Sequence, residues 1–539
     1  MFSCLFFYKK LVVIALIFFI FEIKIMKKLY LLILVVTSSL QSQNFQWVDF
    51  PTVVNGTSTS NLGNVIICDS SNNVYEIGFK DNYFYNSSEV YGNLFYRKYS
   101  NSGEIIFNKQ ISGKVRVISI ASDGLGNIYL VAAFKNIITF ESGASINTAG
   151  TSEELILVKF DTNGQFLWNS IISNFGSFNH FSAISTDLNN NVYLGFDNFI
   201  DSQIVKLSPI NGNTLMTISQ QNVQIISSLS IDNQGNIYAA GSCGKSTSIF
   251  AGVSQPTTLS YSVYAVKYNS TGTHQWTRYA LDITCDNPQI SAKTNNEIYL
   301  SSRLTGAYAF GSLTATGPSS GFSDDIFITK LNETGTFEWI REVPGTGKAN
   351  VGNRNFLTSD SNGNVYFAGS TKGTTIWSSS FTTTVTGNNS DALILKYSNL
   401  GELMQAKTAG GSFSDSCNGI AVDSSENIFV SGLVTGNVTF DGITNSVGNN
   451  VPFIAKIGTT LNVSQNELTT NYSYPNPVNN EVYFSESFNN KEVKFFNVLG
   501  ELVKETFVKN SQPINITNLS SGIYFVKTKD NLTLKLIKK

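Results

Sequence analysis

Charged side chains are scarce in this chain of 539 residues. They make up 14% of the sequence, whereas soluble domains usually contain roughly 25%. The formal net charge is −2, and no basic run occurs outside the N-terminal segment. Nucleic-acid binding requires clustered Lys and Arg that neutralise phosphates, so we expect no nucleic-acid partner.

Histidine is rarer still. Neither His180 nor His274 lies in an HExxH motif or beside a cysteine, and no Gly-x-Ser-x-Gly motif is present. Residues 344–349 (PGTGKA) look like a phosphate-binding loop, but they lack its first Gly and the Ser or Thr that should follow Lys348. They also fall between predicted strands rather than before a helix. We therefore reject a phosphate-binding site there. The sequence therefore predicts no catalytic, cofactor-binding or metal-binding residue, and a protein that is not an enzyme.

The five cysteines form no CxxC or Cys/His cluster, so a structural zinc site is not expected. In an oxidising compartment Cys243 and Cys285 could form a disulfide; the alternative is that they are buried free thiols. The other three are Cys4, Cys68 and Cys417.

Gly, Ser, Thr and Asn are abundant instead, and aromatic residues reach 12%. β-Branched and aromatic side chains suit a pleated sheet, while Gly and Asn suit its turns. The composition therefore favours an all-β protein of short strands. At 539 residues the chain is too long for one ordinary core, which predicts several domains or a repeat array.

The N-terminal segment has the features of a secretory signal peptide. Lys27 and Lys28 precede an apolar run from Leu29 to Val36, and small residues follow up to Ser42. We expect cleavage near Ser42, with residues 1–42 as the signal region. An earlier apolar run, 11–21, is too short to span a bilayer comfortably, so we expect translation to start at Met26; a signal anchor is the rival hypothesis.

Two motifs alternate along residues 45 to 460. The first is an apolar strand followed by Asp, two or three turn residues, Asn, a branched aliphatic residue and an aromatic residue. The Asp is predicted to accept backbone N–H bonds across a tight turn. Calcium binding by these carboxylates is the alternative. The copies begin at Asp69, Asp123, Asp187, Asp232, Asp360 and Asp423, and a degraded seventh copy has Lys293 in place of Asp.

The second motif is an apolar strand that ends in Lys, then a Gly turn, then an aromatic strand. Examples are Lys159 with Gly164 and Trp168, and Lys267 with Gly272 and Trp276. The recurring Trp is expected to fill the space between repeats. Further copies are centred on Lys98, Lys206, Lys330, Lys396 and Lys456.

The Lys456 strand has no following Trp strand, and the Trp47 strand has no preceding Lys strand. Pairing the two completes seven repeats and closes the ring of a β-propeller, which removes open sheet edges. The predicted fold is all-β: a seven-bladed β-propeller over residues 43–461, closed by N- and C-terminal strands. The motifs resemble the bacterial β-propeller repeat called SBBP, which implies an extracellular propeller.

Two further features bear on chemistry. His274 stands where other copies have Phe45, Phe166 or Phe337, two residues before Trp276 in its own strand, so we expect it to replace a packing aromatic. The adjacent acids Asp324–Asp325 and Glu153–Glu154 occupy one repeat position before the Lys strand. A structural role is favoured there over a glycosidase-type carboxylate pair.

Beyond a polar linker at 462–473, residues 474–539 predict a small Ig-like β-sandwich. Pro475-Asn-Pro477, Asn497-x-x-Gly500, Leu519-Ser-Ser-Gly-Ile-Tyr-Phe-Val526 and a basic C-terminal end occur in order. This string resembles the type A sorting domain of the type IX secretion system. The resemblance implies contact with that machinery through residues 474–539, export across the outer membrane of a Gram-negative bacterium, and release or surface attachment. We expect no stable transmembrane span in the mature protein.

The expected function is a secreted or cell-surface binding or adhesion module for an extracellular glycan or protein. The Ser/Thr/Asn-rich loops at 142–152, 314–323 and 377–390 are the candidate contact regions, because rigid scaffolds commonly carry recognition on loops. The alternatives are a secreted hydrolase or lyase that acts on polysaccharide at the propeller axis, and a passive envelope component.

Overall fold

The computed structural model of this protein describes residues 43–51, 64–86, 89–148, 153–172, 183–244, 247–255, 262–280, 287–304, 306–317, 325–459, 473–509, 512–529 and 533–539. Among these residues the regular elements are β-strands and a single-turn 3-10 helix, η1 (Glu486–Phe488), so the all-β prediction is confirmed. The chain divides into two compact units, residues 1–459 and 460–539. The predicted signal region (1–42) and the predicted linker up to residue 472 lie outside the described residues.

The first unit is a series of antiparallel four-strand groups, which we call blades 1 to 7, and its architecture is propeller-like. In blades 1 to 6 the strands pair in chain order, and β5 is long enough to be the last strand of blade 1 and the first of blade 2. Blade 1 is β2 (Val65–Cys68), β3 (Val74–Asn86), β4 (Glu89–Tyr99) and β5 (Ile105–Ser122); blade 2 is β5, β6 (Ile128–Phe140), β8 (Glu154–Phe160) and β9 (Phe166–Ile172). Blade 3 is β10 (Ala183–Thr186), β11 (Val192–Asp197), β12 (Ser202–Leu207) and β13 (Thr214–Gln221); blade 4 is β14 (Ile225–Ile231), β15 (Ile237–Cys243), β18 (Ser262–Tyr268) and β19 (His274–Ala280); blade 5 is β20 (Gln289–Thr294), β21 (Glu297–Arg303), β24 (Ile326–Leu331) and β25 (Phe337–Glu342). Blade 6 is β27 (Leu357–Ser359), β28 (Val365–Lys372), β31 (Asp391–Tyr397) and β32 (Leu403–Gly411); blade 7 is β33 (Ser416–Val422), β34 (Ile428–Val434), β37 (Val451–Thr459) and β1 (Gln43–Asp49).

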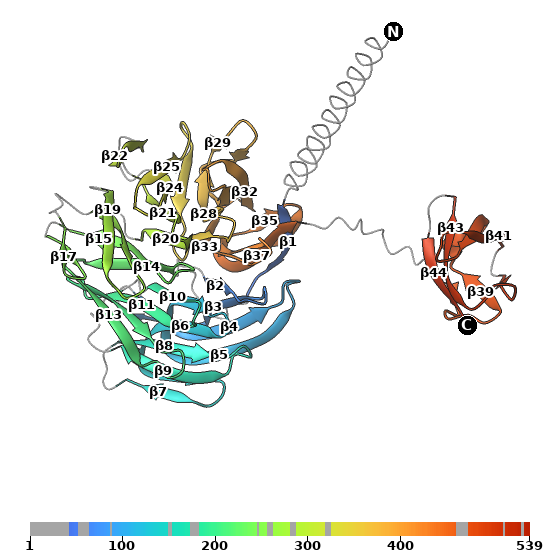
Figure 1. Cartoon of the computed structure of the whole chain (residues 1–539), viewed down its shortest axis with the longest axis horizontal. Coiled ribbons are helices and arrows are strands. Elements are labelled where there is room, and N and C mark those ends of the chain that lie inside the picture. Colours follow the sequence, from blue (N-terminus) through green and yellow to red (C-terminus); the bar gives the residue numbers. More distant parts are fainter. Residues whose placement is uncertain are drawn as a thin grey trace, which may run out of the picture. The chain divides into compact units, whose positions relative to one another are not determined.

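The first strands of successive blades contact one another. β2 contacts β5, and contacts continue in turn through β10, β14, β20, β27 and β33. β33 also contacts β2, so the last blade meets the first. Figure 1 shows the blades following one another in chain order, from the blue strands to the orange ones.

The N-terminal strand β1 pairs antiparallel with β37, and the two lie side by side in Figure 1. Trp47 is opposite Lys456, with a register shift between Phe45 and Trp47. These are the two segments that lacked a partner in the repeat pattern. β1 therefore supplies the outer strand of blade 7.

The core lies in the middle strands of each blade. Every residue of β18 and of β24 is buried, because neighbouring blades cover both faces of these strands. The outer strands are more exposed: in β13 and β9 buried or half-buried positions are interrupted by exposed ones. This gradient explains why the strands that end in Lys read as continuous apolar runs.

Short hairpins follow the second strand of several blades and reach the preceding blade. β16 (Ile249–Phe250) with β17 (Val253–Ser254) pairs with β13, and β35 (Asn437–Phe440) with β36 (Ile443–Ser446) pairs with β32. The end of β6 with β7 (Ser145–Asn147) extends the sheet from β5 in the same way. The remaining short strands are β22 (Ala307–Phe310), β23 (Leu313–Thr316), β26 (Lys348–Val351), β29 (Thr374–Ile376) and β30 (Thr382–Thr384).

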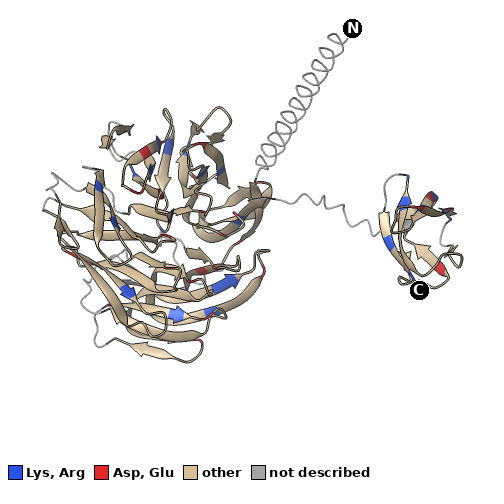
Figure 2. Cartoon of the chain, in the orientation of Figure 1, with Lys and Arg blue, Asp and Glu red and all other residues tan. Residues whose placement is uncertain are grey.

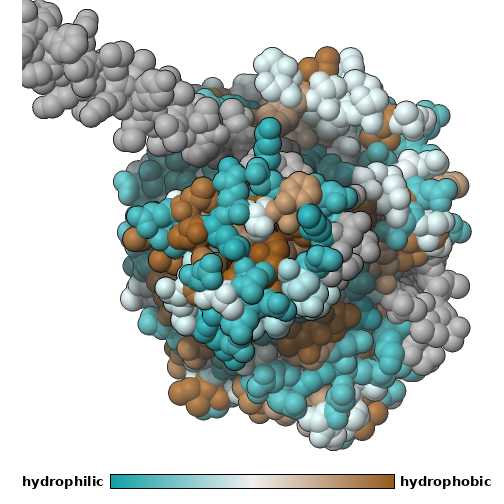
Figure 3. All heavy atoms as spheres, turned by 90° about the vertical axis from the view of Figure 1, so that its right-hand side faces the viewer, coloured by the Kyte–Doolittle hydropathy of each residue, from teal (hydrophilic) through white to brown (hydrophobic). Residues whose placement is uncertain are grey.

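The second unit has two sheets over one apolar core. β38 (Ser473–Tyr474), β39 (Glu481–Phe484) and β42 (Ile514–Asn515) form one sheet; β41 (Leu502–Val508), β40 (Lys491–Phe496), β43 (Gly522–Thr528) and β44 (Thr533–Lys538) form the other. β43 alternates: Tyr524 and Val526 are buried, whereas Ile523 and Phe525 are exposed. The face of the molecule in Figure 3 shows hydrophobic patches between hydrophilic side chains.

Candidate functional site

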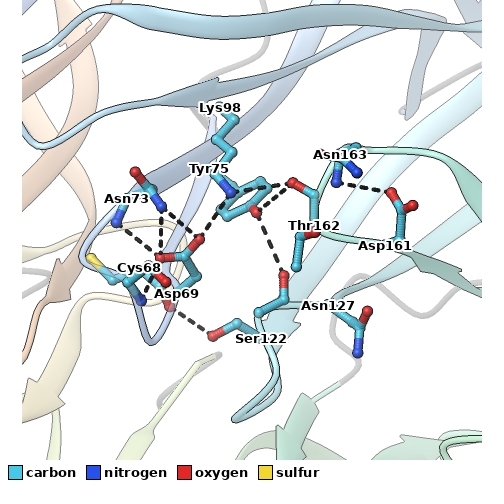
Figure 4. A network of polar contacts seen from close by, with 12 residues as sticks. Cys68, Asp69, Asn73, Tyr75, Lys98, Ser122, Asn127, Asp161, Thr162 and Asn163 are labelled. Atoms are coloured by element: carbon cyan, nitrogen blue, oxygen red, sulfur yellow. Dashed lines mark hydrogen bonds and ion pairs between the residues drawn. The ribbon is translucent and has the colours of Figure 1, made fainter.

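The predicted Asp turns are formed as the motif indicated. Asp69 Oδ1 accepts hydrogen bonds from the backbone N–H groups of Ser71 and Asn73, both at 2.9 Å (Figure 4). The Asn73 side chain donates to the same carboxylate. The equivalent pair of backbone bonds is made by Asp123, Asp187, Asp232, Asp360 and Asp423.

The Lys residues of the second motif link adjacent blades. Lys98 Nζ lies 3.2 Å from Asp69 Oδ2 and 4.8 Å from the centroid of the Tyr75 ring, and it donates to the Thr162 carbonyl of the next blade (Figure 4). A buried ammonium is tolerated because a carboxylate, an aromatic face and a carbonyl surround it. The same placement over a Tyr ring recurs for Lys159, Lys206, Lys267 and Lys396.

These contacts keep the carboxylates of Asp69 and Asp187 ionised. Burial acts to raise the pKa of Asp69, but hydrogen bonds from Asn73 and the Lys98 charge outweigh it and hold the pKa below its ordinary value. The pKa of Asp187 is lowered in the same way by Asn191 and Lys206.

Among the described residues no group of three or more His, Cys, Asp or Glu could hold a metal ion. A calcium ion at these turns would have to displace the existing hydrogen bonds.

The predicted position of the Trp residues between blades is confirmed. Trp276 Nε1 donates to the carbonyl of Glu333, in the Gly turn of the next blade, at 2.9 Å. Gly335 in that turn has φ +76°, and a Cβ there would lie 2.8 Å from Trp276. The Gly thus lets the turn rest on the indole ring. Trp47, Trp168 and Trp339 donate to Asn101, Pro209 and Asn399 in the same way.

The degraded seventh turn differs in geometry. In blade 5 Thr294 is opposite Glu297, so the hairpin is tighter than the Asp turns. Thr294 Oγ1 donates to Glu297 Oε2 at 3.2 Å. Lys293 is accessible, but surrounding atoms partly desolvate its ammonium and lower its pKa, so it has no stabilising role like that of the Asp residues. A tight hairpin does not need the bridging carboxylate that the other six turns have.

His274 packs as an aromatic residue. Its ring lies 6.2 Å from that of Tyr268 in a T-shaped arrangement, and Nε2 is 2.8 Å from Thr277 Oγ1. Burial lowers the pKa of His274, and the nearby Arg278 charge lowers it further, which favours the neutral ring. His180 lies outside the described residues.

The acids before the Lys strands make structural contacts. Glu153 Oε1 accepts from Arg116 Nε at 2.8 Å and from the Tyr91 hydroxyl at 2.7 Å. Asp325 Oδ1 accepts the backbone N–H groups of Ile326 and Val343, and burial raises the pKa of Asp325 to about 6. Asp324 lies outside the described residues.

Two other sequence features have plain structural roles. Residues 344–347 form a turn closed by the Gly347 N–H and the Pro344 carbonyl, and strand β26 follows rather than a helix. Cys243 and Cys417 are buried and Cys68 is half-buried, and no disulfide joins these three. Cys285 lies outside the described residues, so the predicted pairing with Cys243 stays a prediction.

The candidate contact loops are described in part. Residues 142–148 include β7, residues 314–317 end the β22–β23 hairpin, and residues 377–390 include β30. In the last of these, Trp377 is buried and donates to Thr383 Oγ1 at 2.9 Å. The charged residues are few, of both signs, and scattered along the strands (Figure 2).

Sequence reasoning missed a third repeated feature, the Phe that ends the first arm of several hairpins. Phe140 stacks on Phe166 at 4.8 Å, and Phe310 and Phe440 pack edge-on against Phe337 and Phe45. The Phe-Gly spacing in 310–311 and the Phe-x-Gly spacing in 440–442 and 250–252 were the available signal.

Among the described residues, two hollows lie beside these contacts. One, of about 550 Å³, is lined by His274, Trp276, Arg278 and Glu333 among others. The Arg278 guanidinium there donates to the carbonyls of Gly335, Thr277 and Thr334, which satisfies its charge locally. The second is a cavity of about 150 Å³ between blades 1 and 2, lined by Tyr96, Phe140, Phe160 and Phe166 with polar residues around them.

No helix among the described residues is long and apolar enough to cross a membrane.

Comparison with known proteins identifies the second unit. Residues 472–539 match the family described as a secretion system C-terminal sorting domain. No curated protein matches the chain. The chain thus carries a type IX secretion sorting domain after a propeller-like unit, and such a domain implies secretion across the outer membrane in Bacteroidetes.

Similar solved structures include a protein of unknown function from Bacteroides caccae, at 10% identity and a TM-score of 0.31, covering 58% of this chain and 89% of that one. The Dos1 propeller is 9% identical with a TM-score of 0.38, covering 78% and 96%. A protein of unknown function from Dyadobacter fermentans is 10% identical with a TM-score of 0.35, covering 76% and 99%.

Proposed function

We propose that this protein is a secreted or surface-attached binding or adhesion module without catalytic activity, exported through the type IX machinery by residues 474–539. The observation that carries the binding role is the division of labour within the blades. The motif Asp side chains fix turns within a blade, and the motif Lys and Trp side chains make contacts that join neighbouring blades. The hairpins and loops between second and third strands, in contrast, differ from blade to blade. A rigid ring with variable loops is suited to recognition.

We infer that the first unit is a closed seven-bladed β-propeller of the SBBP type. The cyclic contacts of the first strands and the β1–β37 pairing support this reading. We also infer that the second unit is an Ig-like sandwich, since two antiparallel sheets share its core. A signal peptide ending near Ser42, in a protein that starts at Met26, completes the proposed export route.

Export is tested by deleting residues 472–539 in the native bacterium. We expect the truncated protein to stay in the periplasm while the full chain reaches the medium or the cell surface. The control is a foreign periplasmic protein fused to residues 460–539, which should be exported. Export of the truncated chain would contradict the proposal.

Binding is tested with the full secreted chain on a glycan array and a panel of extracellular proteins, with polysaccharide hydrolysis measured in parallel. Binding without turnover is the expected result. Turnover of a polysaccharide would favour the alternative, a hydrolase or lyase. If neither binding nor turnover is observed, a passive envelope component is the remaining hypothesis.

A further inference from the structure

A chain of polar contacts at the seam between blades 7 and 1 is one hydrogen short when both of its acids are ionised. Tyr99 Oη lies 2.8 Å from Asp49 Oδ2 and 3.0 Å from Glu76 Oε2, within hydrogen-bond distance of both. A phenol has a single hydrogen to donate, so Tyr99 serves one carboxylate at a time. The second contact is a hydrogen bond only if one of the two acids carries a proton.

The surroundings place that proton on Glu76. Asp49 is partly exposed, and Arg97 Nη1 lies 3.4 Å from its Oδ2, so water and a cation stabilise the charge of Asp49. Glu76 is fully buried, which disfavours its charged form. Its Oε1 accepts from Asn64 Nδ2 at 2.7 Å, which leaves Oε2, the atom beside Tyr99, to hold the proton.

The electrostatics of the seam agree with this assignment. Burial raises the pKa of Glu76 to about 7. The hydrogen bonds from Asn64 and Tyr99 oppose the rise, and so does the Arg97 charge, which faces Glu76 from β4. The Asp49 charge, which faces it from β1, adds to the rise. Glu76 therefore holds a proton over a pH range in which an exposed Glu is ionised.

An acid stands at this position of the repeat only in blade 1. The residue after the motif aromatic is apolar in the other six blades, where it is Leu130, Leu194, Ala239, Leu300, Phe367 or Val430. Packing of the second strand therefore does not call for a carboxyl group.

The hydrogen bonds of Glu76 lead to blade 7 on both sides. On one side Tyr99 connects it to Asp49 of β1. On the other side its partner Asn64 accepts, at its backbone carbonyl, the Ser431 hydroxyl of β34 at 2.9 Å. The protonation state of Glu76 thus acts on the contacts that hold blade 7 against blade 1.

We propose that this seam is a pH-sensitive latch, in which the Glu76 carboxyl donates its proton to Tyr99 Oη and Tyr99 donates to Asp49. In this state each contact has one donor and one acceptor. When Glu76 gives its proton to water, two carboxylates compete for the Tyr99 hydrogen, and one of them loses its hydrogen bond. β1 then separates more readily from blade 1. The latch goes beyond the proposed binding function and does not depend on it.

The pH range follows from linkage. Glu76 binds its proton with a pKa of about 7 in the closed seam, and with a pKa near its ordinary value of 4.5 once opening admits water. The closed seam is therefore most stable in acid, loses stability as pH rises from about 4.5 to 7, and stays at the lower level above 7.

Hydrogen exchange of the full chain at about pH 5 and about pH 8, corrected for intrinsic rates, tests the latch. The protection factor of β1 should be roughly tenfold or more lower at the higher pH, and β1 should exchange faster there than the middle strand β24. In Glu76→Gln the protection of β1 should be the same at both pH values. Its amide N–H can donate to Tyr99 Oη, and its carbonyl can accept from Asn64.

Two further variants act as controls. Asp325→Asn removes another buried acid, whose pKa burial raises to about 6, from blade 5, so the pH response of β1 should remain. Tyr99→Phe removes the shared hydroxyl, so the protection of β1 should be low at both pH values.

Infrared spectroscopy detects the proton directly. The difference spectrum between wild type and Glu76→Gln should contain the C=O band of a protonated carboxyl group, and this band should disappear as pH rises through about 7. Absence of the band in acid, or the same pH response of β1 in wild type and Glu76→Gln, would overturn the inference. Exchange of β1 and β24 at one rate at the higher pH would do so too, because the seam would then open only when the whole unit unfolds.

Discussion

At the scale of single residues, one buried carboxylate organises each of six turns. Asp232 accepts the backbone N–H groups of Gln234 and Asn236 at 2.8 Å and the Tyr238 hydroxyl at 2.9 Å. Each of these donors is brought close by the turn itself. The Asp side chain therefore fixes both the turn and the Tyr that packs toward the next blade.

Replacing Asp232 by Ala should lower the free energy of unfolding by about 2–4 kcal/mol, because several buried donors lose their acceptor at once. Denaturant unfolding of the purified chain measures the loss. Lys293→Ala is the matched control at the same repeat position. The side-chain contact of its turn joins Thr294 and Glu297 rather than Lys293, so a loss beyond about 0.5 kcal/mol would contradict this account of the motif.

A second residue-level prediction concerns Glu76, a buried acid outside the motifs. Its carboxylate accepts from Asn64 Nδ2 at 2.7 Å and from the Tyr99 hydroxyl at 3.0 Å. Burial raises the pKa of Glu76 to about 7; the hydrogen bonds from Asn64 and Tyr99 and the Arg97 charge oppose the rise, and Asp49 adds to it. The folded protein therefore binds a proton at this site more tightly than the unfolded chain does.

Stability should fall as pH rises from about 4.5 to 7, because the unfolded chain loses this proton first, and it should level off above 7. The difference amounts to about 3 kcal/mol by linkage. Glu76→Gln keeps a neutral group and should lack this part of the pH dependence. Asp325, Asp391 and Asp415, whose pKa values burial raises to about 6, titrate in both proteins, so the comparison isolates Glu76. Parallel curves for the two proteins would refute the assignment.

At the scale of elements, the Gly turns rest against the Trp strands. Gly335→Ala should cost about 2–3 kcal/mol, because the new Cβ would lie 2.8 Å from the Trp276 ring and φ is +76°. Gly345→Ala is the matched control, with φ +62° and nothing within 4 Å, and should cost about 1 kcal/mol. Thermal unfolding of both variants measures the difference. Equal losses would show that backbone strain alone, and not the indole contact, requires the Gly.

The β1–β37 pair gives a further element-level prediction. Trp47 stacks on Tyr99 at 5.8 Å and donates to the Asn101 carbonyl, so it ties blade 7 to blade 1. Trp47→Ala should destabilise the first unit by about 3–5 kcal/mol and speed hydrogen exchange in β37. Trp377→Ala, which removes a Trp from a hairpin, should leave exchange in β37 unchanged. Equal exchange of β37 in wild type and Trp47→Ala would contradict the role of this strand.

The strands and the Asp turns could be predicted because each repeats a short-range pattern. The β1–β37 pair could be predicted although its strands are distant in sequence, because each strand is an incomplete copy of the repeat. Turn chemistry acts over four or five residues, so Asp69 and Asn73 reveal it in sequence. The hairpins that reach the preceding blade could not be derived, because their partners are β13 and β32, tens of residues away, and their register depends on loop length.

At the scale of the whole molecule, the two units have separate hydrophobic cores. Among the described residues, the core cluster of the second unit runs from Val478 to Leu536. A sorting domain must act as a module, since it is defined by its own family and carries its own fold. The two units should therefore unfold as separate cooperative transitions.

Differential scanning calorimetry on the mature chain tests this independence. Val493→Ala removes two buried methyl groups from the small unit and should lower only its transition, by about 10 °C, because a small domain loses several degrees for each kcal/mol. Ile394→Ala should lower only the transition of the first unit, and by fewer degrees, because the enthalpy of a larger unit is greater. If either substitution moved both transitions together, the cores would be energetically coupled. Export would then have to act on the whole chain rather than on an autonomous signal at its end.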